Sequence, residues 1–275
     1  MSPVLSLSKG GIYSRVAPPR TLTIMATQPA IPAATLVVFR DHPDASPEIL
    51  IVERAKAMAF AGGMLAFPGG RIDPGDHELA ATLGGVDEHL PARIAAIRET
   101  IEETGLPVGL TAIPDTQSLA RLRAQLHAQV PIGEALAAEA LAIAPDVLVP
   151  FARWCPNHPH ARIFDTMFYL AELPAEAPPA SVDATENARL FWASATEALA
   201  MCDRGEAAAI FPTRRNLERL AQFGSFADAA AHASATPIVT VTPWVVGEGD
   251  ARRLHIPEDA GYPVTSEALT TAMRG

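Results

Sequence analysis

Cysteine and lysine are scarce in this sequence, and long hydrophobic runs are missing. Only Cys155 and Cys202 occur in 275 residues, which excludes a disulfide-based scaffold and favours a reducing cytoplasm. No run reaches the roughly 18 apolar residues of a membrane-spanning helix, so we expect no membrane partner. Lysine is confined to Lys9 and Lys56, and 31 acidic residues outnumber 21 basic ones. The net charge of −10 argues against a broad nucleic-acid-binding face.

The remaining composition is that of a globular domain, with 49 % hydrophobic and 19 % charged residues. Residues 1–32 show no hydrophobic period and contain several prolines, so we expect a disordered tail, with Met25 as an alternative start. We expect the main domain over 33–235. A C-terminal strand and tail, 236–275, should pack on that domain, with the tail irregular after the strand.

Strand and helix patterns alternate without a strict βαβ rhythm, which predicts an α+β fold with a mixed sheet. Strands are expected over 35–40, 48–53, 64–67, 162–173, 189–192 and 237–246. Helices are expected over 91–104, 114–130, 133–143, 194–202, 213–223 and 225–233.

Three glutamates and an arginine crowd one stretch of the helix predicted over 91–104. Glu99 lies one turn before Glu102 and Glu103, so the three carboxylates project from one side, away from the isoleucine stripe. They repel one another, and Arg98 can offset only part of that repulsion. A divalent cation would offset the rest, and oxygen-only ligands favour Mg²⁺ or Mn²⁺. The alternative is a solvated acidic helix face.

A glycine-rich corner, Phe67-Pro68-Gly69-Gly70-Arg71, follows a predicted strand upstream of this helix. Corner and helix together resemble the signature of the Nudix hydrolases, G-x5-E-x7-R-E-U-x-E-E-x-G-U, where U is a bulky apolar residue. Gly70 matches the first glycine, and Asp76 stands where the first glutamate belongs. Thr100 replaces a bulky apolar residue, which should loosen helix packing. The second half of the signature matches at Arg98, Glu99, Glu102, Glu103, Gly105 and Leu106.

The spacing within the signature departs from the family pattern. Residues 77–97, 21 in all, separate Asp76 from Arg98, where the signature has seven. We interpret about 77–90 as a surface excursion from an intact corner. The chain resembles a family branch with such an insert, which includes the peroxisomal acyl-coenzyme A diphosphatases and bacterial relatives. The resemblance extends to Trp154, Arg162–Tyr169 and Phe191–Ser194, and it implies a Nudix-like α/β/α sandwich with a mixed β-sheet plus extra helices.

The resemblance implies hydrolysis of a nucleoside diphosphate derivative within its diphosphate, with Mg²⁺ or Mn²⁺ as cofactor. By that resemblance Glu99 and Glu103 are the chief metal ligands. Glu102 would share a metal or orient water, and a backbone carbonyl at Gly69 or Gly70 would add a ligand. The expected partner is a small-molecule substrate, bound by a monomer or homodimer.

The catalytic candidates are Glu102 and Glu186, either of which would serve as general base, with Arg98 orienting the carboxylates. Asp165 offers Arg162 an ordinary ion-pair partner, and the alternative role for Arg162 is a phosphate contact. The substrate-binding candidates are Arg54, Gly69, Arg71 and Arg162.

A second motif bears on the substrate. Coenzyme A-cleaving members resemble L-L-T-x-R-[SA]-x3-R-x3-G-x3-F-P-G-G, and this chain matches at Leu50, Arg54, Ala55, Gly63 and Phe67–Gly70. Ala59 replaces the second arginine, which removes a phosphate contact. Coenzyme A or acyl-coenzyme A is therefore one candidate substrate. One alternative is an ADP-ribose or dinucleotide (NADH-type) pyrophosphatase, and another is a non-catalytic nucleotide-sensing module. The three retained glutamates of the signature argue against the module.

Overall fold

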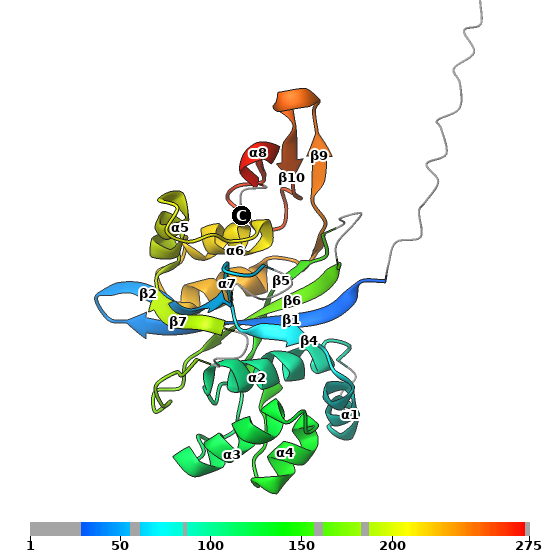
Figure 1. Cartoon of the computed structure of the whole chain (residues 1–275), viewed down its shortest axis with the longest axis vertical. Helices are drawn as coiled ribbons and strands as arrows, with labels where there is room; N and C mark the ends of the chain where they lie inside the picture. Colours follow the sequence, from blue (N-terminus) through cyan, green and yellow to red (C-terminus); the bar gives the residue numbers. More distant parts are fainter. Residues whose placement is uncertain (1–28, 56–60, 85–86, 157–161, 183–186, 273–275) are drawn as a thin grey trace, which may run out of the picture.

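The computed structural model describes residues 29–55, 61–84, 87–156, 162–182 and 187–272 (Figure 1). Most of the predicted tail, residues 1–28, lies outside this range, as does Glu186. Among the described residues, no helix has the length and apolarity needed to cross a bilayer.

A mixed eight-stranded sheet forms the centre of the fold, as predicted (Figure 1). Its main path runs β3-β2-β1-β6-β5-β8, while β4 pairs with β1 and β7 pairs with β2. The β1–β2 pair is an antiparallel hairpin, and β1 runs parallel to β6. The strands are β1 (Ile31–His42), β2 (Ala45–Arg54), β3 (Leu65–Ala66), β4 (Gly69–Arg71), β5 (Val149–Trp154), β6 (Phe164–Glu172), β7 (Asn187–Ala193) and β8 (Thr240–Val241).

Helices cover both faces of the sheet, which confirms the predicted α/β/α arrangement (Figure 1). Leu36 and Leu50 pack into a core with α2, whereas Val37 and Ile51 point to the opposite core, as the alternation of side chains along a strand requires. One face carries α1 (Pro74–Thr82), α2 (Leu90–Thr104), α3 (Thr116–His127) and α4 (Ile132–Ala138). The other carries α5 (Ala195–Asp203), α6 (Phe211–Leu220) and α7 (Phe226–Ala235).

Helix α2 forms as predicted because its signals are local. Pro91 occupies the first turn, where its missing N–H costs nothing. Ile94, Ile97 and Ile101 form one fully buried stripe against the sheet. Gly105 ends the helix with a φ of 68°, in the left-handed region that glycine enters without strain.

The chain enters the site through a fork between β1 and β2. β3 pairs with β2, and after Phe67-Pro68 the chain crosses over so that β4 pairs with β1. The Pro68 carbonyl accepts a hydrogen bond from Leu36 N–H at 2.9 Å. A Cβ at Gly69 would overlap the Ala34 carbonyl oxygen, so this crossing needs a residue without a side chain.

Three sequence-based predictions differ from the structure. The insert is not a simple surface excursion, because its first residues, 77–82, are helical within α1 and bury Ala80. The strand predicted over 237–246 is divided between β8 and β9 (Trp244–Val246) at Pro243, which has no N–H to donate. The C-terminal tail is not irregular, since β9 pairs with β10 (Arg253–His255), followed by β11 (Ser266–Ala268) and α8 (Leu269–Ala272).

The C-terminal segment is tied to the domain by a buried polar chain. Trp154 Nε1–H donates to the Tyr262 hydroxyl at 2.7 Å, and that hydroxyl donates to Asn216 Oδ1 at 2.8 Å. All three residues are buried. Burial raises the pKa of Tyr262 to about 12, so its hydroxyl keeps its proton at neutral pH.

Replacing Tyr262 with phenylalanine should lower the free energy of unfolding by about 1–3 kcal/mol, because a buried donor and a buried acceptor both lose their partner. Urea unfolding measures the change. Tyr169→Phe is the matched control, because that hydroxyl makes one long hydrogen bond, 3.4 Å, to the His89 carbonyl. Equal losses in the two variants would contradict the importance of this link.

Candidate active site

The glutamates of α2 lie against the glycine corner. Glu103 is 3 % exposed, and its Oε2 accepts a hydrogen bond from Gly69 N–H at 3.3 Å. A Cβ at Gly70 would overlap the carboxylate of Glu99, so that carboxylate also rests on bare backbone. The acidic side of α2 is therefore not a solvated face, because two of its carboxylates are packed against the β4 backbone.

Arg98 joins the helix to the corner. Its Nε and Nη2 donate to the two carboxylate oxygens of Asp76 at 3.0 and 2.9 Å. Nη2 also donates to the Arg71 carbonyl at 2.9 Å, and Nη1 donates to Glu99 Oε1 at 2.8 Å. The guanidinium is thus held by both strand and helix, which fixes where Glu99 points.

The charges around Arg98 compensate for its burial. Burial alone lowers the pKa of this guanidinium, but the hydrogen bonds that it donates to Asp76 and the charge of Glu99 outweigh that effect and raise its pKa well above the usual value. Asp76 is fully buried and also accepts a hydrogen bond from Asp73 N–H at 2.8 Å. The residues inserted after Asp76 thus leave its contact with Arg98 in place.

Two residues of α3, absent from the sequence-based site, support the end of α2. Arg123 donates to the carbonyls of Glu102 and Glu103 at 2.8 and 3.1 Å, which satisfies two of the acceptors left open at a helix C-terminus. It also donates to Ser181 Oγ at 2.6 Å, in the segment between β6 and β7. His127 Nδ1 lies 3.4 Å from Glu102 Oε1. Only their spacing of four along one helix was visible in the sequence.

The predicted substrate-binding residues are dispersed around this centre. Gly69 is at the corner, and the Arg71 side chain is exposed beside it. Arg54 ends β2, and Arg162 is exposed just before β6. Of the two alternatives for Arg162, the ion pair with Asp165 is not found among the described residues. Asp165 instead accepts two hydrogen bonds from Arg153 on the neighbouring strand, at 2.8 and 2.6 Å.

Thr100 does not loosen the helix as the signature comparison predicts. It is fully buried, and its hydroxyl donates to the Ala96 carbonyl at 2.7 Å. The polar group is satisfied within the helix, so the residue packs without a buried unpaired donor.

In the described part of the chain, no three His, Cys, Asp or Glu side chains are arranged to hold a metal ion. The donor chemistry nevertheless fits a hard cation. Glu99, Glu102 and Glu103 offer only carboxylate oxygens, and the corner beside them leaves backbone accessible.

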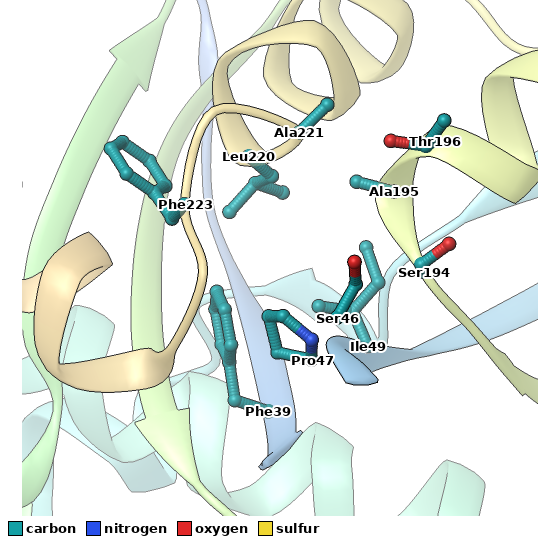
Figure 2. A pocket seen from close by; sticks show the side chains of 10 residues that line it. All are labelled: Phe39, Ser46, Pro47, Ile49, Ser194, Ala195, Thr196, Leu220, Ala221 and Phe223. Carbon is teal, nitrogen blue, oxygen red and sulfur yellow. The ribbon is translucent and has the colours of Figure 1, made fainter. Parts of the chain in front are cut away.

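The surface hollow in Figure 2 lies elsewhere. It is lined by residues such as Phe39, Ile49 and Phe223, from the face of the sheet opposite α2, and by the hydroxyls of Ser46 and Thr196. No carboxylate lines it, so it offers nothing for binding a cation.

Comparison with known proteins identifies the fold and the family. A Nudix hydrolase from Alicyclobacillus acidocaldarius superposes with a TM-score of 0.64 at 30 % identity, over 78 % of this chain and 99 % of that one. This chain belongs to the Nudix hydrolase family. The family assignment makes it a hydrolase of pyrophosphate bonds. No protein-family model matches the sequence, and no curated protein matches it significantly.

Other solved structures resemble the chain more weakly. The Nudix domain of Shewanella oneidensis NrtR, solved with ADP ribose, is 16 % identical over 64 % of this chain and 79 % of that one, with a TM-score of 0.37. A Caenorhabditis elegans Ap4A hydrolase is 19 % identical over 64 % of this chain and 89 % of its own, with a TM-score of 0.35.

In this Nudix hydrolase, Asp76→Asn should lower the free energy of unfolding by about 3 kcal/mol, because it leaves the buried Arg98 charge without its main partner. Chemical denaturation of purified protein gives the value. Asp73→Asn is the control, since that carboxylate is 38 % exposed and 3.7 Å from Arg98. If both variants lose the same stability, the Asp76 contact does not hold the corner.

Proposed function

We propose that this hydrolase cleaves the diphosphate bond of a nucleoside diphosphate derivative, with a divalent cation held by Glu99 and Glu103 and with coenzyme A or acyl-coenzyme A as substrate. The observation that carries the proposal is the packing of these two carboxylates against Gly69 and Gly70. That arrangement puts negative charge directly against a backbone without side chains, where a cation and a phosphate can approach together. The acyl-coenzyme A branch rests on the signature and its insert.

When bound, Mg²⁺ or Mn²⁺ would neutralise the diphosphate and lower the pKa of a water molecule. The residues of the chain then have separate tasks. Glu102 accepts the proton of the attacking water at its carboxylate, close to His127. Arg98 positions the Glu99 carboxylate through a hydrogen bond to its Oε1 and does not need to contact the substrate. Glu186, the other candidate base, lies outside the described residues.

Exposed positive charge supports binding of an anionic substrate. Arg71 and Arg162 are both exposed, so their guanidinium groups can reach phosphate oxygens. Arg54 sits at the end of β2 and supports the part of the substrate attached to the diphosphate.

A second substrate class is favoured by one departure in sequence. Ala59 stands where coenzyme A-cleaving relatives carry an arginine, so one phosphate contact of that class is missing. ADP-ribose or a dinucleotide such as NADH, which lacks the 3′-phosphate of coenzyme A, is the alternative.

Glu103→Gln should abolish turnover, by about a thousandfold or more, while leaving the fold intact, because the amide keeps the shape and an oxygen acceptor but loses the charge that attracts a cation. Initial rates with Mg²⁺ and with Mn²⁺ test this. Glu88→Gln is the matched control, because that side chain is 87 % exposed on the insert. Full activity of the Glu103 variant would remove the metal assignment.

Mass spectrometry of reaction products would separate the substrate classes. The panel contains coenzyme A, acetyl-coenzyme A, ADP-ribose, NADH, diadenosine polyphosphates and 8-oxo-dGTP. Release of 3′,5′-ADP and phosphopantetheine supports coenzyme A, whereas AMP from ADP-ribose or NADH supports the alternative. No product with either metal would contradict the proposal and favour a nucleotide-sensing module.

A further inference from the structure

Asn187, the first residue of β7, is a buried polar side chain with unused hydrogen-bonding groups. It is 2 % exposed, and neither its Oδ1 nor its Nδ2 has a hydrogen-bond partner among the described residues. Leaving both atoms unpaired costs folding free energy that a leucine of similar shape would not cost. Such a group calls for an explanation, and a bound ligand supplies one.

Arg54 lies directly across the strand pair from Asn187. The two residues are register partners of β2 and β7, and side chains of directly opposed residues share one face of a sheet. The Nε of Arg54 is also buried without a partner. Two neighbouring side chains thus present three unused polar atoms, which are two donor nitrogens and one acceptor oxygen.

A β-bulge at this point of the β2–β7 pair changes the direction of the Asn187 side chain. Between Glu53 and Arg54 the register shifts, because β7 advances from Arg189 to Asn187 while β2 advances by one residue. A bulge of this kind redirects a side chain and is common beside active sites.

The pair belongs to the same side of the sheet as α2. Leu50 packs with α2, and Arg54 follows it by four residues along β2, on the same face. Glu53, one residue before Arg54, and its register partner Arg189 lie on the opposite face, where they pair at 3.1 Å. Asn187 is two residues from Arg189, so it shares the face of Arg54 only because β7 carries an extra residue at this bulge. Asn187 is buried, but Arg54 is partly exposed, so a ligand can approach from the Arg54 side.

Distance along the chain limits how far Asn187 can lie from the C-terminal end of α2. Ser181 is fixed at the end of α2 by Arg123, and its N–H donates to the Thr104 carbonyl at 2.8 Å. Asn187 follows Ser181 by six residues, which limits the separation of their Cα atoms to about 20 Å.

The three atoms select the chemistry of the ligand. A phosphate offers only acceptors at neutral pH, so it would leave Asn187 Oδ1 facing another oxygen. A neutral group with a donor beside an acceptor satisfies the carboxamide, as an adenine edge does for asparagine in nucleic-acid recognition.

We propose that Asn187, with Arg54 beside it, binds a neutral donor–acceptor group in the part of the substrate attached to the diphosphate. This inference rests on the proposed function. Two sources carry that chemistry, the adenine base and an amide of the pantetheine arm. They are distinguished by experiment.

Isothermal titration calorimetry of the full chain with AMP, IMP and 4′-phosphopantetheine is the test, since it needs no turnover. Asn187→Leu should weaken binding of either AMP or phosphopantetheine by about tenfold, the effect of losing a hydrogen bond to a buried group. If the N6/N7 edge of adenine is the ligand, the wild type should also prefer AMP to IMP by about tenfold. IMP has the acceptor O6 where AMP has the N6 donor, so both atoms of that edge become acceptors. The variant should lose that preference.

Thermal unfolding provides the second readout. Because the leucine variant removes an unsatisfied polar group, its melting temperature should not fall. Arg189→Gln, on the same strand but across the bulge and paired with Glu53, is the matched control and should bind every ligand as the wild type does. Asn187→Ala removes the same two polar atoms and takes the place of a leucine variant that fails to fold.

Unchanged dissociation constants in the Asn187 variants would overturn the inference, as would absence of AMP and phosphopantetheine binding to the wild type. Where the wild type still hydrolyses a diphosphate substrate, that result leaves the proposed function intact. Absence of hydrolysis across the substrate panel contradicts the proposed function instead, and an Asn187-dependent preference for AMP would then support the site alone.

Discussion

The guanidinium of Arg98 is the interaction on which the rest of the site depends. It is 7 % exposed and contacts Asp76, the Arg71 carbonyl and Glu99 within 3.0 Å. This charge offsets part of the repulsion among three carboxylates within one helical turn, the most buried of which, Glu103, accepts a hydrogen bond from Gly69 N–H. The buried positive charge therefore makes an acidic helix compatible with a packed sheet. It also fixes the distance between α2 and β4.

The residues inserted after Asp76 and the helix α3 pack around this centre and leave its contacts in place. The insert after Asp76 folds partly into α1, so the extra residues extend a helix that begins at the corner. Helix α3 gives support at the far end of α2, where Arg123 takes up the last carbonyls and holds Ser181. The glutamates are thus braced at both ends, which is the rigidity that a cation site requires.

Local signals made the centre predictable. Isoleucine spacing and Gly105 defined α2 almost to the residue, and the glycine corner was recognisable because close backbone contacts tolerate no side chain. Strand β5 was missed because it is short and contains Pro150. The supports from α3, the Arg153–Asp165 pair and the opposition of Arg54 and Asn187 depend on contacts between distant segments, which periodicity does not encode. The composition of the carboxylate cluster was readable, whereas its burial was not.

Crystals soaked in Mn²⁺ would test the account most directly, because anomalous scattering locates the ion independently of catalysis. We predict a peak within bonding distance of carboxylate oxygens of Glu99 and Glu103, beside the Gly69–Gly70 backbone, with Arg98 still bound to Asp76. Two results would contradict the view that these carboxylates form the metal centre. One is manganese bound elsewhere, and the other is the absence of a peak with the hydrogen bond from Gly69 N–H to Glu103 retained.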